Sequence, residues 1–434
     1  MKYSQAMEYM ENMNRLGSVP GLDSIKELCK RLGNPQDRLR FVHIAGTNGK
    51  GSTLAYISTV LTIAGYRTGR YSSPAVFDYR ERFQIDGKNI SKQAFSKYLS
   101  IVAAQADEME AEGMAHPTSF EIETALAFLY FLDQRCDIVV LEAGMGGLED
   151  ATNLIHTTIV SVFASVSMDH MQFLGKTLSE IARQKAGIIK PGGIAVSMRQ
   201  APEVMQVICD TCRREQVELV VADVSEATNV KYGFDKQSFS YGGYRNLVIS
   251  LAGKWQIENA VLAVGVLKVL ERAGYPVSEE HLRSGLRETV WQGRYTVLAR
   301  KPLFVIDGAH NADASEKLAC TIEQDFEGKQ KIFIMGILRD KEYEKIIQNT
   351  VKLADQIITV AAPDNPRAMS SYELAQEIRP YQSHVTAADS LEEAVEMAYL
   401  FADSKSVIIA FGSLSYQGRL VEIVNKKLAG KCRK

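Results

Sequence analysis

The sequence predicts an α/β protein with two domains, of which the first is built on a doubly wound and mostly parallel sheet and the second is a smaller α/β domain. Short apolar runs alternate with longer amphipathic segments along most of the chain, and this rhythm restarts near residue 303 after an interruption. A length of 434 residues also exceeds what one compact core normally supports. We therefore predict a first domain over residues 1–294 and a smaller second domain over residues 295–434.

The first domain is expected to begin with a short amphipathic helix over Gly21–Leu32 and then to alternate strands with helices. Continuous apolar runs are typical of parallel strands that are buried on both faces. Ser91 is expected to cap a long helix, and the pair Gly242 and Gly243 predicts the turn of an antiparallel hairpin. The predicted strands of the sheet are Phe41–Ile44, Thr68–Tyr71, Ile138–Leu141 and Thr158–Val166.

The second domain follows a predicted hinge at Trp291–Arg294. Its first strand opens into a polar loop over Asp307–Asn311, and amphipathic segments separate the later strands. The predicted strands are Leu303–Ile306, Lys331–Met335, Gln356–Val360 and Ser406–Ala410.

The stretch Phe41–Thr53 joins a strand, a Gly-rich turn and the start of a helix. In this arrangement consecutive backbone N–H groups and a helix N-terminus converge on a phosphate group. Lys50 adds a positive charge, and either Ser52 or Thr53 can turn its hydroxyl toward a phosphate-bound Mg²⁺. The glycine spacing departs from the general phosphate-loop pattern, and a Gly-rich turn with an exposed lysine is the alternative. The agreement of strand, turn, lysine and hydroxyls favours a phosphate site.

Three further polar side chains follow predicted strands of the same sheet. Ser73, Glu142 and His170 leave the sheet at the carboxyl edge that also carries Lys50. A carboxylate, a hydroxyl and an imidazole are a plausible ligand set for a hard cation that a nucleotide carries. A hydrogen-bonded histidine at a strand end is the alternative for His170, and its place beside the phosphate loop favours the metal site.

Three other residues carry weaker signals. Arg294 and Asp307 flank the predicted cleft, where an arginine can contact a transferring phosphate and an aspartate can hold a ribose hydroxyl. Surface ion pairing is the alternative for both residues. Lys185 lies in the last turn of a predicted helix, where a lysine complements the helix dipole.

Composition excludes several classes of function. A formal net charge of −2 and a pI near 6.4 give no broad positive surface for nucleic acid or an anionic membrane. The first 16 residues lack an apolar signal core, and no apolar run reaches membrane-spanning length. Cys209 and Cys212 form an isolated pair on a predicted helix, so a metal or redox role is not favoured. We expect a cytoplasmic monomer that binds small molecules, without a nucleic-acid or membrane partner.

These residues together resemble the folylpolyglutamate synthase and dihydrofolate synthase family, within the Mur ligase superfamily of ATP-dependent amide-bond-forming enzymes. The resemblance runs over nearly the whole chain. Its motifs are Leu32–Gln36, His43–Thr53, Ser73-Pro74, Glu81-Arg82, Phe120-Glu121, Glu142–Gly147, Asp150–Asn153, Asp169-His170, Lys185–Gly192, Gln256 with Asn259, Gly293-Arg294, Asp307–Asn311 and Gly412–Leu414.

The resemblance implies a Mur-ligase-type ATP-binding domain followed by a Rossmann-like glutamate-ligase domain. It implies Mg²⁺ as the cofactor, with Ser73, Glu142 and His170 as its ligands, and ATP as a co-substrate. Lys50, Lys185 and His310 would be the catalytic residues, and Lys185 matches the lysine that is carbamylated in this family. ATP would be bound by Asn48, Gly49, Lys50, Gly51, Ser52, Asn259, Arg294 and Asp307.

For the other substrates, the resemblance places Ser413 and His310 near the incoming L-glutamate. The pterin or folate pocket would be lined by Phe120, Glu121, Glu149, Asp150 and Ala151. Ala75, Arg80 and Leu148 depart from the residues that are usual in the family, and all three lie near the expected folate-binding loops. These departures leave the choice of pterin substrate open.

The expected activity is ATP-dependent addition of L-glutamate to folates, to dihydropteroate, or to both, through an acyl phosphate. A Mur-type ligase acting on a peptidoglycan precursor is one alternative, which Glu121 and the Asp150–Asn153 motif disfavour. A non-ligase phosphate-loop ATPase is another, and ATP turnover without an amino acid would be characteristic of it.

Overall fold

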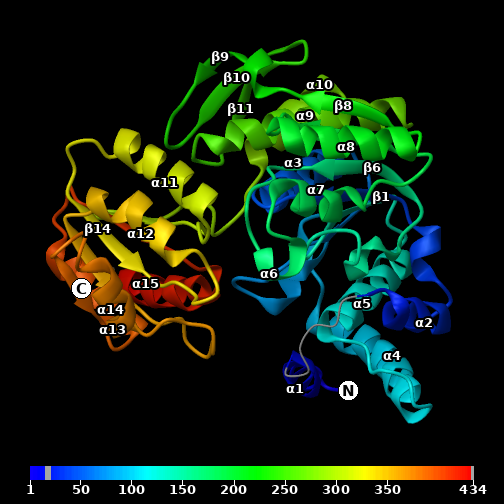
Figure 1. The fold of residues 1–434 in the computed structure, drawn as a ribbon, viewed down its shortest axis with the longest axis horizontal. Helices are drawn as coiled ribbons and strands as arrows, with labels where there is room; N and C mark the ends of the chain where they lie inside the picture. Colours follow the sequence, from blue (N-terminus) through cyan, green and yellow to red (C-terminus); the bar gives the residue numbers. More distant parts are fainter. Residues whose placement is uncertain (15–20, 432–434) are drawn as a thin grey trace.

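The computed structural model describes residues 1–14 and 21–431 and shows two α/β domains (Figure 1). The first domain contains an eight-stranded sheet in the order β4-β3-β2-β5-β1-β6-β7-β8. Strands β2, β5, β1, β6, β7 and β8 run parallel, whereas β3 and β4 are antiparallel additions at one edge. The strands are β1 (Phe41–Ala45), β2 (Thr68–Tyr71), β3 (Phe83–Ile85), β4 (Lys88–Asn89), β5 (Ile138–Glu142), β6 (Thr158–Phe163), β7 (Ile194–Met198) and β8 (Glu218–Ala222).

Helices cover both faces of this sheet, as the doubly wound prediction requires. Side chains of β1 alternate: Val42 and Ile44 pack with α3, α9 and α10, whereas Phe41 packs with α4 and α5 on the opposite face. The helices are α1 (Tyr3–Asn14), α2 (Asp23–Arg31), α3 (Lys50–Ile63), α4 (Lys92–Ala111), α5 (Ser119–Asp133), α6 (Met171–Leu174), α7 (Leu178–Ala186), α8 (Pro202–Arg214), α9 (Trp255–Arg272) and α10 (Glu279–Glu288). Ser91 caps α4 as predicted, since its side chain accepts a hydrogen bond from the Ala94 N–H.

The predicted hairpin is confirmed, and it belongs to a separate three-stranded antiparallel sheet. This sheet contains β9 (Thr228–Lys231), β10 (Gln237–Tyr241) and β11 (Tyr244–Ile249). Phe234, which precedes β10, makes edge-to-face contacts with Tyr295 and Phe326. Trp255 at the start of α9 contacts Tyr295 as well, so an aromatic cluster joins the two domains.

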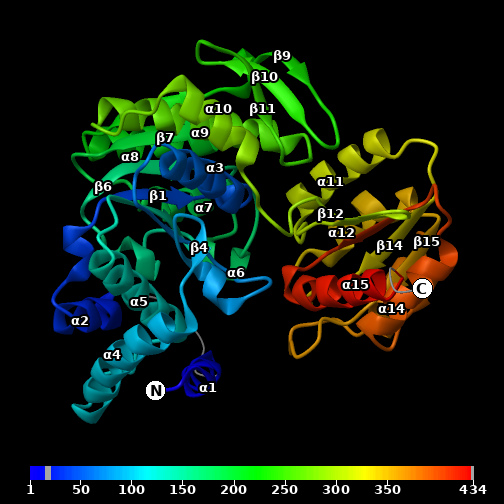
Figure 2. The same ribbon diagram turned by 180° about the vertical axis from the view of Figure 1, so that it is seen from behind.

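The second domain contains a six-stranded sheet in the order β12-β13-β17-β14-β15-β16. Only the β12–β13 pair is antiparallel. Its elements are β12 (Thr296–Arg300), β13 (Leu303–Ile306), α11 (Ala312–Asp325), β14 (Lys331–Met335), α12 (Tyr343–Thr350), β15 (Gln356–Thr359), α13 (Ser371–Ile378), β16 (Val385–Ala387), α14 (Leu391–Phe401), β17 (Val407–Phe411) and α15 (Gln417–Lys431). Figure 2 shows the two domains side by side, with α11 on the side of the first domain.

The structure corrects the end of one predicted strand and adds elements that the sequence did not predict. Strand β6 ends at Phe163 rather than Val166, because the Ser165 carbonyl leaves the ladder and accepts hydrogen bonds from the N–H groups of Thr47 and Asn48. Strands β12 and β16 lie at the two edges of the second sheet and were not predicted. Short 3₁₀ helices occupy Pro35–Arg38, Tyr79–Arg82, Ala151–Leu154, Val224–Glu226, Val351–Leu353 and Leu414–Tyr416.

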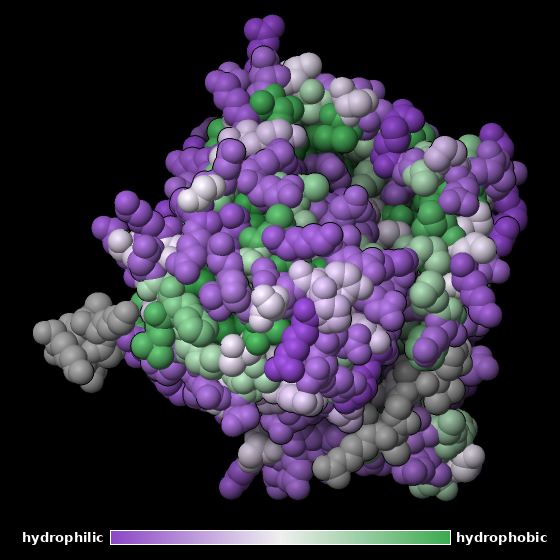
Figure 3. Space-filling view, turned by 60° about the vertical axis from the view of Figure 1, so that its left-hand side comes forward, coloured by the Kyte–Doolittle hydropathy of each residue, from purple (hydrophilic) through white to green (hydrophobic). Residues whose placement is uncertain are grey.

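The molecular surface agrees with the composition. On the face drawn in Figure 3, hydrophilic residues predominate and apolar residues are interspersed among them. Within the described residues, no helix combines the length and the apolar character that a membrane span requires.

Candidate active site

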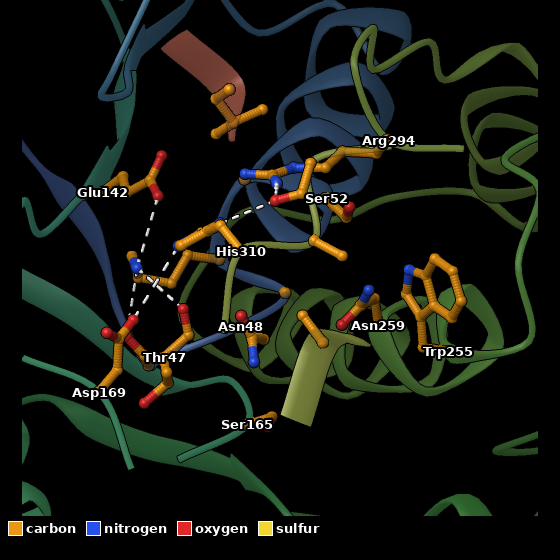
Figure 4. A pocket seen from close by; sticks show the side chains of 18 of the residues that line it. Thr47, Asn48, Ser52, Glu142, Ser165, Asp169, Trp255, Asn259, Arg294 and His310 are labelled. Carbon is orange, nitrogen blue, oxygen red and sulfur yellow. Dashed lines mark hydrogen bonds and ion pairs between the residues drawn. The ribbon is translucent and has the colours of Figure 1, made fainter. Parts of the chain in front are cut away.

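A cavity between the two domains collects most of the residues that the sequence singled out (Figure 4). It lies at the carboxyl ends of β1, β2, β5 and β6 and faces the loop after β13. The first domain contributes Gly46, Thr47, Asn48, Gly49, Lys50, Gly51, Ser52, Ser73, Pro74, Glu142, Gly144, Met145, Gly146, Ser165, Asp169, His170, Leu174, Lys185, Trp255, Glu258 and Asn259. Arg294, Asp307, Gly308, Ala309, His310, Ala314, Lys317 and Leu414 complete the lining.

The phosphate loop connects β1 to α3 and turns at Gly49, the N-cap of α3, where φ is 86°. A side chain there would be strained, and its Cβ would lie 2.4 Å from the Asn259 Oδ1. Gly51 is restricted by packing alone, because a Cβ would lie 2.7 Å from the Trp291 ring. The glycines therefore let the N-terminus of α3 lie close against α9 and Trp291 while its first N–H groups face the cavity.

Two lysines and one carboxylate form the charged centre of the cavity. Lys50 Nζ donates to the carbonyl oxygens of Gly46, at 3.2 Å, and Thr47, at 3.4 Å, and lies 3.9 Å from Glu142 Oε1. Lys185 Nζ, which is buried, donates to the same Gly46 carbonyl at 2.8 Å. Burial, and after it the charge of Lys50, lowers the pKa of Lys185 to about 7. Burial also raises the pKa of Glu142, an effect that Lys50 and Arg294 oppose.

A hydrogen-bond chain fixes the start of α3 against α9. Gln256 Nε2 donates to Ser52 Oγ at 3.1 Å, and Asn259 Nδ2 donates to Gln256 Oε1 at 3.1 Å. All three residues are buried. These hydrogen bonds hold the Ser52 hydroxyl in place at the wall of the cavity.

Asp169 joins the two domains at the rim of the cavity. Its Oδ1 accepts from Lys341 Nζ at 2.8 Å, and its Oδ2 accepts from Asn311 Nδ2 at 3.3 Å. Burial opposes ionisation of Asp169, but the charge and hydrogen bond of Lys341, together with the neighbouring charges of His170 and His310, lower the pKa of Asp169. Asn48 Nδ2 in the phosphate loop also reaches across, donating to Asp313 Oδ2 at 2.7 Å.

The two histidines of the cavity differ in backbone conformation and in the contacts of their rings. His170 adopts a left-handed φ of 49°, an uncommon conformation that is often found at functional sites. Burial lowers its pKa, although Asp169 acts in the opposite direction. His310 Nδ1 lies 2.7 Å from the Gly308 carbonyl. Burial, followed by the charge of Lys341, lowers the pKa of His310 to about 4, so this imidazole is neutral near pH 7.

Asp307 organises the loop that follows β13. Its Oδ2 accepts from the Tyr295 N–H at 2.8 Å, and its Oδ1 accepts from the Ala309 N–H at 2.8 Å. Burial raises its pKa, and the charge of Arg294 opposes that rise. Arg294 Nη1 lies 3.4 Å from the Gly308 carbonyl, so the predicted hinge and the loop after β13 meet in the cavity.

Six predicted substrate residues do not line this cavity. Glu121 caps α5 by accepting from the N–H and the hydroxyl of Thr118, at 2.7 and 2.8 Å. Asp150 is buried and accepts from the N–H groups of Met145 and Thr152, at 2.7 and 3.0 Å. Phe120, Glu149, Ala151 and Ser413 also lie outside the lining, although Ser413 directly precedes Leu414. Their substrate roles stay predictions.

Sequence reasoning missed Lys341 and Trp255. Lys341 follows β14 by six residues, and its position after a strand of the second sheet was the available signal. Trp255 is the first residue of α9, and nothing in the sequence indicated that it lines a cavity.

The donor set around Glu142 fits a cation that is shared with a substrate. Within the described residues, no group of three His, Cys, Asp or Glu side chains forms a metal site of protein ligands alone. Ser73, Glu142 and His170 nevertheless line one cavity together with the phosphate loop. Because Mg²⁺ usually takes only one or two carboxylates beside phosphate oxygens and water, this set suits Mg²⁺.

Comparisons with known proteins agree with the fold and the cavity. The model of the Mur ligase middle domain matches residues 44–267, and that of the Mur ligase glutamate ligase domain matches residues 293–414. The dihydrofolate synthase/folylpolyglutamate synthase of Bacillus subtilis is 33% identical over 428 residues, covering 95% of this chain and 97% of that protein. The chain therefore belongs to the folylpolyglutamate synthase and dihydrofolate synthase family of Mur ligases.

Two solved structures extend the comparison to bound ligands. Folylpolyglutamate synthase of Mycobacterium tuberculosis complexed with ADP has a TM-score of 0.90 at 28% identity, over 97% of this chain and 98% of that chain. An Escherichia coli protein in complex with DHPP and ADP has a TM-score of 0.86 at 26% identity, over 98% of both chains.

Proposed function

We propose that this protein is an ATP-dependent ligase that joins L-glutamate to a folate, with tetrahydrofolates, dihydropteroate or both as acceptors. The observation that carries the proposal is the interdomain cavity, in which a phosphate loop faces a buried carboxylate, two lysines and a neutral histidine. The names of the relatives supply the acceptor class and the amino acid.

ATP is proposed to bind with its phosphates on residues 48–52, where the first N–H groups of α3 and Lys50 neutralise their charge. Asn259, Arg294 and Asp307 are proposed to hold the rest of the nucleotide, because they line the same cavity as Gly49 and Gly51. Closure of residues 295–434 onto residues 1–294 would then exclude water from the reacting groups.

Ser73, Glu142 and His170 are proposed to hold Mg²⁺ next to the phosphate loop. A magnesium ion there supplies positive charge to the transferring phosphoryl group. The buried Glu142 carboxylate has Lys50 Nζ at 3.9 Å, beyond ordinary hydrogen-bond distance, so its oxygens are able to accept a further cation.

In the first step, an oxygen of the acceptor carboxylate bonds to the γ-phosphorus of ATP while the bond to the bridging oxygen of ADP breaks. In the second, the amine of L-glutamate attacks the acyl carbon, inorganic phosphate leaves, and the amine loses a proton. Lys50 stabilises the transferring charge, and the chain needs no nucleophile of its own. We propose that His310 and Ser413 orient L-glutamate, with Nε2 of the neutral imidazole accepting a hydrogen bond from the amine.

Lys185 is proposed to react with carbon dioxide to give a carbamate. A pKa of about 7 leaves a substantial fraction of its amine uncharged and nucleophilic near pH 7.5. The amine loses a proton in this reaction, and the product carries a negative charge near Lys50, which donates to the same Gly46 carbonyl as Lys185. This charge is proposed to help to organise the cation and the phosphates.

The pterin is proposed to bind near Phe120, Glu121, Glu149, Asp150 and Ala151. The Phe120 ring lies over Gly144, where a Cβ would come within 2.6 Å of the ring, so this group is adjacent to the wall of the cavity. We further propose a cytoplasmic monomer, in keeping with the free thiols of Cys29, Cys136, Cys209, Cys212 and Cys320.

The test is ADP release with Mg-ATP and L-glutamate, in separate reactions with dihydropteroate and tetrahydrofolate. Each product is checked by mass spectrometry for one added glutamyl unit. Product from both acceptors would identify a bifunctional synthase, and product from one would name the preferred acceptor. ADP release that needs neither glutamate nor acceptor would contradict the proposal and support a non-ligase ATPase.

A further inference from the structure

A second cavity adjoins the first and shares Gly51, Ser73, Glu142 and Arg294 with it. Its separate wall includes Arg70 on β2, Gln84 on β3 and Trp291 in the hinge. Any group bound in this second cavity therefore lies beside two of the proposed metal ligands, Ser73 and Glu142.

Arg70 is the most unusual residue of this wall. Its neighbour Tyr71 points into the apolar core with α5, so alternation along β2 directs Arg70 to the opposite face of the sheet. There its guanidinium lies 5.0 Å from the centre of the Trp291 ring, the same ring that packs on Gly51. The arginine is thus separated from the phosphate loop by one aromatic side chain.

Within the part of the chain that the structure describes, the guanidinium of Arg70 forms no ion pair. Among the described residues no carboxylate lies within 4.0 Å of its nitrogens, and its buried Nε has no hydrogen-bond acceptor. Burial lowers its pKa to about 10, against the charges of Glu81 and Glu142, so Arg70 is still charged at neutral pH. An arginine with unused donors is costly to bury, and this cost is recovered when an anion binds.

The acids around this cavity are engaged elsewhere. Glu81 accepts from the N–H groups of Phe77 and Asp78, at 3.3 and 3.4 Å, and thereby holds the loop after Pro74. Asp78 forms an ion pair with Arg80 at 2.5 Å. Glu142 has Lys50 as its nearest cation. Arg70 is consequently left to interact with a group that comes from outside the chain.

We propose that Arg70 binds the α-carboxylate of the acceptor's terminal glutamyl residue, while the γ-carboxylate reaches past Ser73 and Glu142 to ATP. This inference rests on the proposed function and adds a determinant of acceptor choice. A glutamyl folate carries two carboxylates close together, and only one reacts. The unreactive one needs a counter-ion once it leaves water, and a guanidinium matches it in charge and shape. Dihydropteroate has a single carboxylate, the reacting one, and makes no use of Arg70.

The test compares Arg70→Met and Arg70→Lys with the wild type. The matched control is Arg67→Met, an exposed arginine three residues earlier whose guanidinium contacts Gln134. KM and kcat are measured for tetrahydrofolate, dihydropteroate, ATP and L-glutamate in turn. Arg70→Met is expected to raise KM for tetrahydrofolate about 10- to 100-fold, with the other three KM values within about twofold. Arg70→Lys is expected to recover part of the loss.

A second arm needs no variant. A tetrahydrofolate analogue in which γ-aminobutyrate replaces glutamate keeps the reacting carboxylate and lacks the other. The wild type is expected to use it about 10- to 100-fold less well than tetrahydrofolate, and Arg70→Met is expected to show no such preference.

Other outcomes would overturn the inference. Equal use of the analogue and tetrahydrofolate by the wild type would mean that no α-carboxylate is recognised. A rise in KM confined to ATP or L-glutamate would assign Arg70 to another substrate, and equal losses for every substrate would make its role structural. A wild type that uses dihydropteroate alone would overturn the inference and leave the proposed function standing. Product from no acceptor would instead contradict the proposed function.

Discussion

The two sheets present their carboxyl ends to one cavity, but they build their contributions in different ways. The distinctive contribution of the first sheet is backbone: the loop after β1 turns at a glycine with φ of 86° and directs the N-terminus of α3 at the cavity, where Ser73, Glu142 and His170 add side chains. The second sheet uses side chains, since Asp307 ties down its own loop and leaves His310 and Asn311 facing the first domain. A site built from backbone N–H groups requires glycines at fixed positions of the sequence. A site built from side chains requires only a few polar residues.

The comparison is tested most strongly by removing charge from the first edge. Glu142→Gln keeps the shape of the buried side chain, and we expect kcat to fall by about 10²- to 10³-fold because a ligand of the proposed cation is lost. The melting temperature is expected to stay the same or rise, since burial already opposes the charge of Glu142. Steady-state ADP release and thermal unfolding measure the two effects.

The control for Glu142→Gln is Glu203→Gln, an exposed glutamate at the start of α8. Near-normal turnover by Glu142→Gln would remove the metal assignment. A large fall in melting temperature would show instead that the carboxylate serves the fold.

The second edge is tested at the interdomain pair of Asp169 and Lys341, whose side chains are 9% and 8% exposed. We expect Lys341→Met and Asp169→Asn each to lower kcat/KM about 10- to 100-fold, because the second domain is then no longer held in its position relative to the phosphate loop. The kcat/KM of the double variant is expected to be no lower than that of the more impaired single variant, because every variant breaks the same Asp169–Lys341 ion pair. A double-mutant cycle on kcat/KM measures this coupling.

Arg339→Met is the matched control for Lys341→Met, because Arg339 lies on the same loop and pairs with Glu373 at the surface. Additive losses at Asp169 and Lys341 would contradict an interdomain role for the pair. They would leave the first edge as the main determinant of activity.

The contrast between the edges explains which residues could be predicted. Lys50 was found because strand, glycines, lysine and hydroxyls occur together in 13 consecutive residues, Phe41–Thr53. The strand-end rule found Ser73, Glu142 and His170, since parallel strands bring distant residues to one edge. The same rule applied to β14 leads to Lys341, but the lysine sits six residues into a loop with no local pattern.

Other features lay beyond what the sequence indicates. Arg70 occupies a short strand whose opposite face is apolar, and only the packing of Trp291 from the distant hinge shows that it borders a cavity. Edge strands β12 and β16 were missed because the pattern of buried parallel strands does not extend to the margin of a sheet. Glu121 was assigned a substrate role, and the structure adds its hydrogen bonds to Thr118 at the start of α5.

The next prediction concerns the pH dependence of carbamate formation at Lys185, in the cavity that the two edges share. With a pKa of about 7, its amine is mostly neutral above pH 7 and mostly protonated below it. We expect isotope-labelled bicarbonate to give a carbamate signal at pH 8 that halves near pH 7 and falls about tenfold by pH 6. Nuclear magnetic resonance of the labelled protein measures it, and Lys185→Ala is expected to abolish it.

In bicarbonate-free buffer, Lys185 also affects stability. Its pKa in the folded protein is below the ordinary value of 10.5, so the unfolded chain binds more protons between pH 7 and pH 10.5. The free energy of unfolding is therefore expected to increase as pH rises through that window, and this increase is expected to be absent from Lys185→Met.

The carbamate proposal has its own decisive outcome. An active enzyme whose Lys185 stays unmodified in bicarbonate would contradict it.

The smallest expected effect separates the reasons for which glycine is needed at the two ends of α3. Gly51→Ala brings a Cβ to 2.7 Å from the Trp291 ring, whereas Gly65→Ala meets no atom within 4 Å but requires a φ of 94°. We expect Gly51→Ala to cost about 1–3 kcal/mol of unfolding free energy and to weaken ATP binding, because Trp291 and the start of α3 are displaced. Gly65→Ala is expected to cost about 1 kcal/mol and to leave ATP binding unchanged. Chemical denaturation and ATP titration distinguish the two variants. Equal loss of ATP affinity in both would mean that the stability of α3, rather than close packing at the phosphate loop, limits nucleotide binding.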